Sequence, residues 1–177
     1  MQDVNSKIND ISLSIMIPIF NEEKHLKRVL KSALNVTPNV FIVDSQSNDA
    51  SLSIAENFNC PVLQWPPQNF EDSNWSMKLN WGINNNPFNT EWIMRLDADE
   101  VIDEKLSASI KHFINSKKSQ EYDGCKFNKA FFFMKKRIRY GGYNKNYQLR
   151  LHRNNKKIFW EDRRTDEHLK GYSKIYK

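Results

Sequence analysis

The feature that most constrains this sequence is a set of short apolar runs, each followed at once by polar or acidic residues. Such runs occupy residues 14–20, 40–43 and 91–96, and their length is typical of strands buried in a sheet. The segments between them carry apolar residues three and four positions apart, which is the period of a helix with one buried face. Strands that alternate with helices over short connections predict an α/β fold with a parallel sheet.

The expected helices have recognisable start signals. Asn21 is expected to cap the first helix, because two glutamates follow where the helix dipole favours negative charge. Asn48 or Asp49 is expected to cap the second helix, with Leu52 on its inward face. A third helical stretch is expected to include Trp75. The first two helices thus begin close to the ends of the first two strands.

Both the pattern and the charge change after Asp123. Up to that residue the chain has 11 basic and 17 acidic residues, and beyond it 16 basic and 4 acidic residues, so charges of −6 and +12 give the net charge of +6. A basic tail would suit nucleic acid, an anionic membrane surface or a phosphorylated substrate. Residues 125–134 and 147–152 have strand composition, and 154–155 are expected to form a hairpin turn into 156–160. We therefore expect one domain, residues 1–177, with an antiparallel C-terminal extension.

Several protein classes are excluded by what the sequence lacks. No apolar run approaches the roughly 18 residues of a membrane span, and the first ten residues lack the apolar block of a signal peptide. Cys60 and Cys125 fit neither a disulfide framework nor a zinc site, so a reducing cytoplasm is the expected location. Neither a phosphate-binding loop nor a glycine-rich dinucleotide motif is present.

Polar residues stand at the ends of three expected strands, at Asn21-Glu22, Asp44 and Asp97-Ala98-Asp99. Open α/β sheets bind ligands at the edge formed by the carboxyl ends of their strands, so these residues would line one crevice if the three strands lie side by side. Two carboxylates two positions apart point to the same side of an extended segment. Such oxygen ligands suit Mg²⁺ or Mn²⁺, with further ligands from a diphosphate.

Each of these residues also has a plain structural explanation. Asp99 or Asp103 could cap the next helix. Asp44 could form a turn instead of accepting hydrogen bonds from a nucleotide base or ribose. Asn21 and Glu22 are adequately explained as helix signals.

Later residues leave similar alternatives open. Residues 161–168, which read EDRRTDEH, could supply a general base or could be a solvated charge cluster. Four arginines could meet phosphates or simply face solvent: Arg137, Arg139, Arg150 and Arg153. Four tryptophans are interpreted as core residues rather than sugar platforms: Trp75, Trp81, Trp92 and Trp160.

Four motifs occur in the order SIMIPIFNEE, FIVDSQSNDAS, WIMRLDADE and TDEHL. In this order they resemble the family 2 glycosyltransferases of the GT-A fold, which implies a mostly parallel, Rossmann-like sheet flanked by helices. The stretches NWSMKLNWGI and RYGGYNKNYQLRLHRNNKKIFWEDRRTDEHL resemble one branch, the bacterial beta-1,4-glucosyltransferases of the lipopolysaccharide inner core. The resemblance covers residues 12–169.

The resemblance implies an inverting, metal-dependent transfer of a sugar, expected to be glucose, from a UDP-sugar to a lipopolysaccharide-core or other cell-envelope glycan. It implies Mg²⁺ or Mn²⁺ as cofactor, a nucleotide-binding half at residues 12–123 and an acceptor-side half at 124–177. The acceptor would be a glycolipid or phosphorylated glycan, reached by peripheral contact with the cytoplasmic face of the inner membrane. No nucleic acid partner is expected.

The resemblance also assigns roles to particular residues. Five would bind the nucleotide: Asn21, Glu22, Asp44, Ser45 and Asp97. Asp99 would coordinate the divalent cation, with His168 as a further ligand. Glu167 would be the catalytic base, with Asp166 as the alternative.

Other functions remain open at the level of sequence. Relatives continue beyond the point where this chain stops, so a truncated, inactive nucleotide-sugar-binding remnant is one alternative. A nucleic-acid-binding module that uses the basic, aromatic tail is another, although the acidic strand ends would repel a phosphate backbone. A sugar nucleotidyltransferase would need a glycine-rich loop where this chain has Asn-Glu-Glu.

Overall fold

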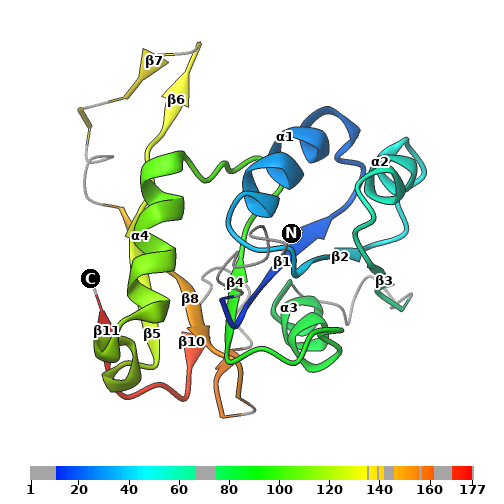
Figure 1. Cartoon of the computed structure of the whole chain (residues 1–177). Coiled ribbons are helices and arrows are strands. Elements are labelled where there is room, and N and C mark those ends of the chain that lie inside the picture. The colour runs from blue at the N-terminus through cyan, green and yellow to red at the C-terminus, as the bar shows by residue number, and fades with distance from the viewer. Residues whose placement is uncertain are drawn as a thin grey trace, which may run out of the picture.

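A computed structural model of the chain describes residues 11–66, 75–134, 136–138, 140–141, 146–155, 157–161 and 169–176 (Figure 1). Its centre is a seven-stranded sheet. In spatial order the strands are β11 (Ile175–Tyr176), β5 (Gly124–Asn128), β8 (Tyr147–Arg153), β4 (Trp92–Arg95), β1 (Leu13–Ile19), β2 (Val40–Asp44) and β3 (Val62–Gln64). Of these seven strands, β8 alone runs against the others, because it is antiparallel to both of its neighbours.

The middle of this sheet is buried on both faces. Every residue of β1, β2 and β4 is buried, as expected for near-continuous apolar strands in a parallel sheet. Ile19 of β1 lies beside Asp44 of β2, and Met16 of β1 lies beside Arg95 of β4. The three strands therefore lie side by side, which is the condition for their ends to face one crevice.

Helices cover both faces of the sheet. They are α1 (Glu23–Leu34), α2 (Ser51–Asn57), α3 (Trp75–Asn84) and α4 (Glu104–Asn115), followed by the short 3₁₀ helix η1 (Lys117–Glu121). Residues of α1, α2 and α4 share one core cluster with Leu13, Ile15 and Ile17 of β1, whereas α3 packs with Met16 in a second cluster. This division follows from the alternation of side chains along β1. The predicted α/β fold is therefore confirmed.

Two of the expected helix starts differ from the structure. α1 begins at Glu23, and Asn21 adopts a left-handed backbone (φ 55°) two positions earlier instead of capping the helix. Asp49 does serve α2, because its Oδ1 accepts a hydrogen bond from the Ser51 N–H at 2.9 Å, although Ala50 occupies the N-cap position. Leu52 is partly exposed rather than inward, because the buried side of α2 is centred on Ser51 and Ala55, four residues apart, and Leu52 lies at its edge.

The C-terminal region adds two ribbons outside the main sheet. One pairs β9 (Phe159–Trp160) with β10 (Leu169–Lys170), and the other pairs β6 (Phe132–Phe133) with β7 (Lys136–Arg137). The expected hairpin around residues 154–155 is therefore wrong in its pairing, since β8 pairs with β4 and β5 instead of with β9. β4 is a longer strand than the two-residue β9, so it offers β8 more backbone partners than β9 could. In the described part of the chain, no helix has the length and apolar character needed to cross a membrane.

Candidate active site

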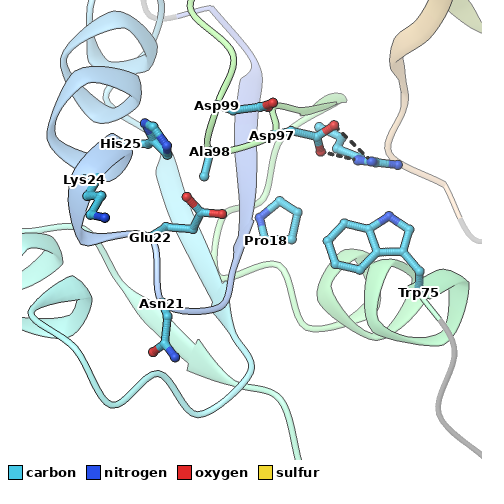
Figure 2. Close-up of a pocket in the computed structure, with 10 residues that line it drawn as sticks. Pro18, Asn21, Glu22, Lys24, His25, Trp75, Asp97, Ala98 and Asp99 are labelled. Carbon is cyan, nitrogen blue, oxygen red and sulfur yellow. Dashed lines mark hydrogen bonds and ion pairs between the residues drawn. The ribbon is translucent and has the colours of Figure 1, made fainter.

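A pocket of about 520 Å³ lies where the carboxyl ends of β1 and β4 meet the start of α1. Figure 2 shows Lys24 and His25 of α1 on one side of this pocket and Trp75 of α3 on the other. Its remaining wall includes Pro18, Asn21, Glu22, Arg95, Asp97, Ala98 and Asp99. The structure thus brings the predicted strand-end residues of β1 and β4 to one site.

The turn after β1 is fixed by the loop after β2. The Asn21 N–H donates to Ser47 Oγ at 2.8 Å, and Asn21 Oδ1 accepts from the Asn48 N–H at 2.9 Å. The Glu22 N–H donates to Ser51 Oγ at 2.9 Å. These contacts hold Asn21 in its left-handed conformation, so that Glu22 is presented to the pocket.

Asp44 ends β2 but does not line the pocket. It is 0% exposed, and its carboxylate accepts hydrogen bonds from both the N–H and the hydroxyl of Ser47. Ser45 follows it, half-buried, with its N–H donating to the Ile19 carbonyl at 3.1 Å. The turn that the sequence allowed for Asp44 is therefore present in the structure.

Lys78 on α3 is a buried cation beside these strand ends, and no sequence pattern predicts a role for it. Its Nζ donates to the Ile19 carbonyl at 2.8 Å. Burial lowers the pKa of this amine to about 8, against the opposing attraction of the Asp44 carboxylate. The lysine therefore ties α3 to the end of β1 and gives Asp44 a positive neighbour.

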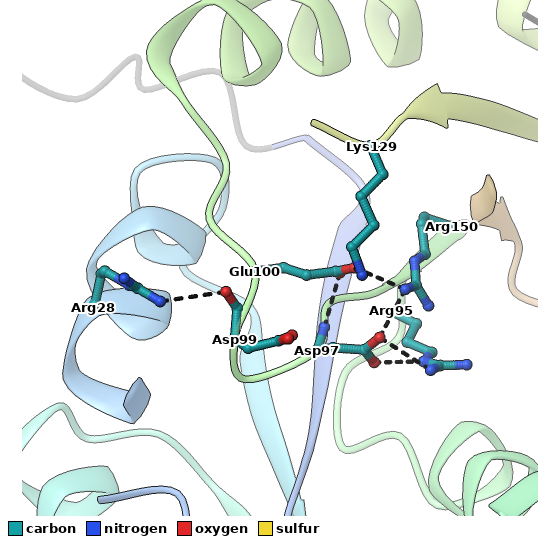
Figure 3. A network of polar contacts seen from close by, with 7 residues as sticks. All are labelled: Arg28, Arg95, Asp97, Asp99, Glu100, Lys129 and Arg150. Atoms are coloured by element: carbon teal, nitrogen blue, oxygen red, sulfur yellow. Dashed lines mark hydrogen bonds and ion pairs between the residues drawn. The ribbon is translucent and has the colours of Figure 1, made fainter. Parts of the chain in front are cut away.

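Asp97 is held by two arginines (Figure 3). Arg95 Nε lies 2.8 Å from Asp97 Oδ1, and Arg150 Nη2 of β8 lies 2.7 Å from Asp97 Oδ2. Burial alone would raise the pKa of the Asp97 carboxyl, but the two guanidinium groups outweigh it and the pKa falls below its ordinary value. Asp97 is therefore a fixed anion.

Glu100 extends this network and fixes the loop after β4. Its Oε2 accepts from the Asp97 N–H at 3.1 Å, while its Oε1 contacts Arg150 at 2.8 Å and Lys129 Nζ at 2.6 Å. The contacts join a loop of the acidic region to basic residues from β8 and from beyond β5. The sequence left open whether Arg150 meets phosphates or faces solvent. In the structure Arg150 does neither, because it pairs with Asp97 and Glu100.

Asp99 differs from Asp97 in having its carboxylate open to the pocket. The residue is exposed, and its backbone carbonyl accepts from Arg28 at 3.3 Å (Figure 3). No side chain in the described part of the chain pairs with its carboxylate. The helix cap that could have explained it is supplied by Asp103, whose Oδ1 accepts from the Leu106 N–H at 2.7 Å.

The carboxylates at the pocket are compatible with a divalent cation that takes most of its ligands from water and phosphate. Among the described residues, no three or more His, Cys, Asp or Glu side chains gather as a metal site. Mg²⁺ in phosphate-handling sites typically takes one or two carboxylates, with the rest from water and phosphate. One open carboxylate at the pocket fits that pattern.

Trp75 was expected in the core and is instead 40% exposed at the pocket wall. Arg95 explains its position, because the guanidinium lies 5.3 Å from the Trp75 ring and 5.1 Å from the Trp160 ring. Trp92 and Trp160 are buried as predicted, and Trp81 is half-buried. The arginine thus lies between two indole rings while it holds Asp97.

The predicted base and late metal ligand, Asp166, Glu167 and His168, lie outside the described residues, as does Arg139. The described residues that flank them are placed next to α3. Asn80 exchanges two hydrogen bonds with the backbone of Trp160, at 2.7 and 2.8 Å, and Trp160 pairs with Leu169 across the β9–β10 ribbon.

Comparisons with known proteins agree with this geometry. The family model described as glycosyl transferase family 2 matches residues 14–174. An uncharacterized glycosyltransferase of Rickettsia typhi is 26% identical over 110 residues, covering 62% of this chain and 35% of that protein. One of Mycoplasma genitalium is 26% identical over 125 residues, covering 67% of this chain and 41% of that protein. The chain thus spans about a third of the length of the Rickettsia relative.

Solved structures share the fold. S. aureus TarS 1-349 gives a TM-score of 0.52 at 21% identity, covering 64% of this chain and 34% of that one. Glucosyl-3-phosphoglycerate synthase from Mycobacterium tuberculosis, solved in complex with Mg²⁺ and uridine diphosphate, gives 0.50 at 15% identity, covering 64% and 42%. At these identities the likeness speaks for the GT-A fold, while the family model covers nearly the whole chain. This protein belongs to glycosyl transferase family 2.

Proposed function

We propose that this chain transfers glucose from UDP-glucose to a hydroxyl group of a cell-envelope glycan, with a membrane-borne lipopolysaccharide core as the acceptor class. One observation carries the proposal: the open carboxylate of Asp99 in a pocket at the carboxyl edge of the sheet, in a chain of this family. The synthase from Mycobacterium tuberculosis, with its bound Mg²⁺ and uridine diphosphate, supports a UDP-sugar donor and a divalent cation. Residues 12–123 would bind the donor and residues 124–177 would face the acceptor.

Asp99 would hold Mg²⁺ or Mn²⁺, with His168 as a candidate second ligand. A bound cation would neutralise charge that develops on the departing diphosphate. Asp97 would approach the ribose. A carboxylate has about four acceptor sites, so the hydrogen bonds from Arg95 and Arg150 leave capacity for a sugar hydroxyl.

The base of the nucleotide would lie toward the end of β2. Asn21, Glu22 and Ser45 would border it, and Asp44 would accept a hydrogen bond from uracil. Because Asp44 is 0% exposed and its carboxylate contacts Ser47, the nucleotide would have to displace Ser47 to reach it. The neighbouring Lys78 would place a positive charge beside the Asp44 carboxylate.

Glu167, or Asp166 in its place, would remove the proton from the acceptor hydroxyl. The acceptor oxygen would form a bond to the anomeric carbon as the bond to the diphosphate breaks on the opposite face. One such displacement inverts the anomeric configuration and releases UDP. The contact of Trp160 with Arg95, a residue of the pocket wall, supports a base from this part of the sequence, since Asp166 and Glu167 follow Trp160 by six and seven residues.

The decisive experiment measures UDP release from a panel of UDP-sugars with Mn²⁺ and lipopolysaccharide-core extracts as acceptor. The Asp99→Asn variant is expected to lose about a thousandfold in turnover, because the cation loses its charged protein ligand. Asp103→Asn is the matched control, since it makes the same change four residues away at a helix cap that asparagine fills equally well. Wild-type turnover by Asp99→Asn would contradict the proposed metal site.

A second pair of variants tests the base. Glu167→Gln is expected to abolish release while calorimetry still detects UDP binding, because only proton removal is lost. Asp166→Asn is its control. Full turnover by Glu167→Gln together with loss in Asp166→Asn would move the role to Asp166. If the wild-type chain binds UDP but releases none from UDP-sugars with any acceptor, the chain is an inactive nucleotide-sugar-binding remnant.

A further inference from the structure

We propose that the β6–β7 hairpin is the surface through which this protein binds anionic phospholipid membranes. The hairpin is a separate two-stranded ribbon that projects away from the body of the molecule (Figure 1). The inference rests on the proposed function only for the reason why this protein would bind membranes, because a glycolipid acceptor would be found there.

Large apolar side chains are concentrated on this hairpin. Phe132 and Phe133 are 66% and 68% exposed, and Met134 at the turn is 82% exposed. A two-stranded ribbon by itself has no third strand or helix with which to bury them. Met134 has a left-handed backbone (φ 50°), which favours Gly, Asn or Asp, so the turn does not explain a methionine. Apolar groups gathered at one protruding point are typical of an interaction surface.

Each exposed phenylalanine lies across the ribbon from a basic residue. Phe132 pairs with Arg137, and Phe133 pairs with Lys136. Because successive residues of a strand face opposite ways, each face of the ribbon carries one aromatic ring and one cation. Both basic residues are exposed. This combination suits the boundary of a bilayer, where rings enter the acyl region and cations meet headgroup phosphates.

The charge around the hairpin selects an anionic partner. Residues 130–145, which include the hairpin, contain five lysines and arginines and no aspartate or glutamate, whereas Arg150 and Arg153 farther along pair with acids of the first region. Anionic lipid surfaces attract such clusters over roughly a Debye length. Nucleic acid would also be attracted, but rings on opposite faces of a narrow ribbon do not form the stacking platform that single-strand binders use. A lipid boundary, in contrast, accepts apolar groups from both faces at once.

The first test places a fluorescent reporter at the tip. Native Cys60 and Cys125 are buried, and burial raises the pKa of both thiols to about 11, so a Met134→Cys variant can be labelled selectively. A polarity-sensitive dye there is expected to shift to shorter wavelength with phosphatidylethanolamine–phosphatidylglycerol vesicles and to stay unchanged with phosphatidylcholine vesicles. Leu52→Cys on α2 is the control. No shift at the tip, or an equal shift at Leu52→Cys, overturns the proposal.

The second test separates the apolar and ionic contributions by vesicle sedimentation. The double variants Phe132→Ser/Phe133→Ser and Lys136→Glu/Arg137→Glu are each expected to weaken binding about tenfold. Lys27→Glu/Lys31→Glu makes the same charge change on the exposed face of α1 and is expected to bind like the wild type. Equal losses in all three variants would overturn a specific role for the hairpin.

Two further outcomes would assign the hairpin to another partner. Salt-sensitive binding to oligonucleotides without vesicle binding would make it a nucleic acid surface. A dimer in ultracentrifugation that Phe132→Ser/Phe133→Ser converts to a monomer, again without vesicle binding, would make it a contact between two copies. None of these measurements uses a sugar nucleotide, so their failure is independent of UDP release.

Discussion

The region up to Asp123 and the region after it are built in opposite ways. In the first, β1 and β2 are buried at every residue and pair with each other across a single helix. In the second, β6 and β7 are exposed at every residue, and β8 is stabilised by pairing with β4 of the first region. The first region therefore has a core of its own, whereas the second depends on the first for its place.

Arg150 offers the strongest way to break that dependence. Its guanidinium joins β8 to Asp97 and Glu100, and its side chain is only 9% exposed. Arg150→Ala would leave Asp97 with Arg95 alone and Glu100 with Lys129 alone, so the free energy of unfolding is expected to fall by about 3 kcal/mol. Urea unfolding followed by circular dichroism measures this loss.

Arg137→Ala is the matched control, because Arg137 is exposed on β7 and the same truncation should change stability by less than about 0.5 kcal/mol. Similar small effects for both variants would mean that the two regions are held together by strand pairing alone.

His152 tests the same junction through pH. It lies buried in β8, and burial lowers its pKa to about 4, against the opposing hydrogen bond to the Arg153 carbonyl. In the unfolded chain the pKa returns to about 6.5, so between those values the unfolded state binds a proton that the folded state does not. Stability is complete above pH 6.5 and is expected to fall by about 2 kcal/mol between pH 7 and pH 5.

The variant His152→Gln should remove that loss of stability. The pH window also excludes Asp97 and Asp123, whose pKa values are lowered and whose effects begin below their ordinary value of 3.8. If wild type and His152→Gln lose equal stability between pH 7 and pH 5, the histidine is not the group that makes the junction acid-sensitive.

Two glycines, one in each region, compare how closely the elements pack. A Cβ on Gly124 of β5 would lie 2.9 Å from the Leu151 carbonyl oxygen of β8, a backbone atom that cannot move away alone. A Cβ on Gly82 of α3 would meet Met16 Sδ at 2.6 Å and Val43 Cγ2 at 2.7 Å, both of them side-chain atoms rather than backbone. Gly124→Ala is expected to cost about 2 kcal/mol, and Gly82→Ala about 1 kcal/mol after the gain in helix propensity.

Thermal unfolding of the two variants at one pH checks this order. A larger loss for Gly82→Ala would show that α3 packs on the sheet more tightly than β5 packs on β8, contrary to expectation.

The smallest expected effect concerns the loops of the first region. The Asp49 carboxylate accepts from the Glu23 N–H at 3.0 Å and from the Ser51 N–H at 2.9 Å, so one side chain serves the starts of α1 and α2. Asp49→Ala should lower the free energy of unfolding by about 1 kcal/mol. Asn48→Ala, next to it, keeps the backbone N–H that donates to Asn21 and should be near neutral. Equal losses of stability in Asp49→Ala and Asn48→Ala would show that the Asp49 carboxylate does not stabilise the two helix starts.

Sequence reasoning succeeded where structure is set by neighbours along the chain. The apolar runs predicted β1, β2 and β4, and their order in the sheet placed Glu22 and Asp99 at one pocket. Asp103 was recognised as a possible cap because capping depends on the next three residues. These are local effects, and a single sequence contains them.

Sequence reasoning failed where the partner of a residue lies far away in the sequence. The pairing of β8 with β4, and with it the contact of Arg150 with Asp97, joins residues that no local pattern relates. The sequence predicts Trp75 as a core residue, because nothing nearby in it shows that Arg95 lies against the Trp75 ring. The proposed roles of Glu167 and Asp99 remain predictions, to be tested by activity.

The central position of β8 also bears on how the chain folds during synthesis. β1, β2 and β4 can pair as soon as residue 95 has left the ribosome, but one edge of β4 then stays open until β8, which ends at Arg153, arrives. An open strand edge is a template for wrong partners, including other nascent chains. The nascent protein thus has a long interval in which its sheet is half built, and chaperone binding would be most useful at that stage.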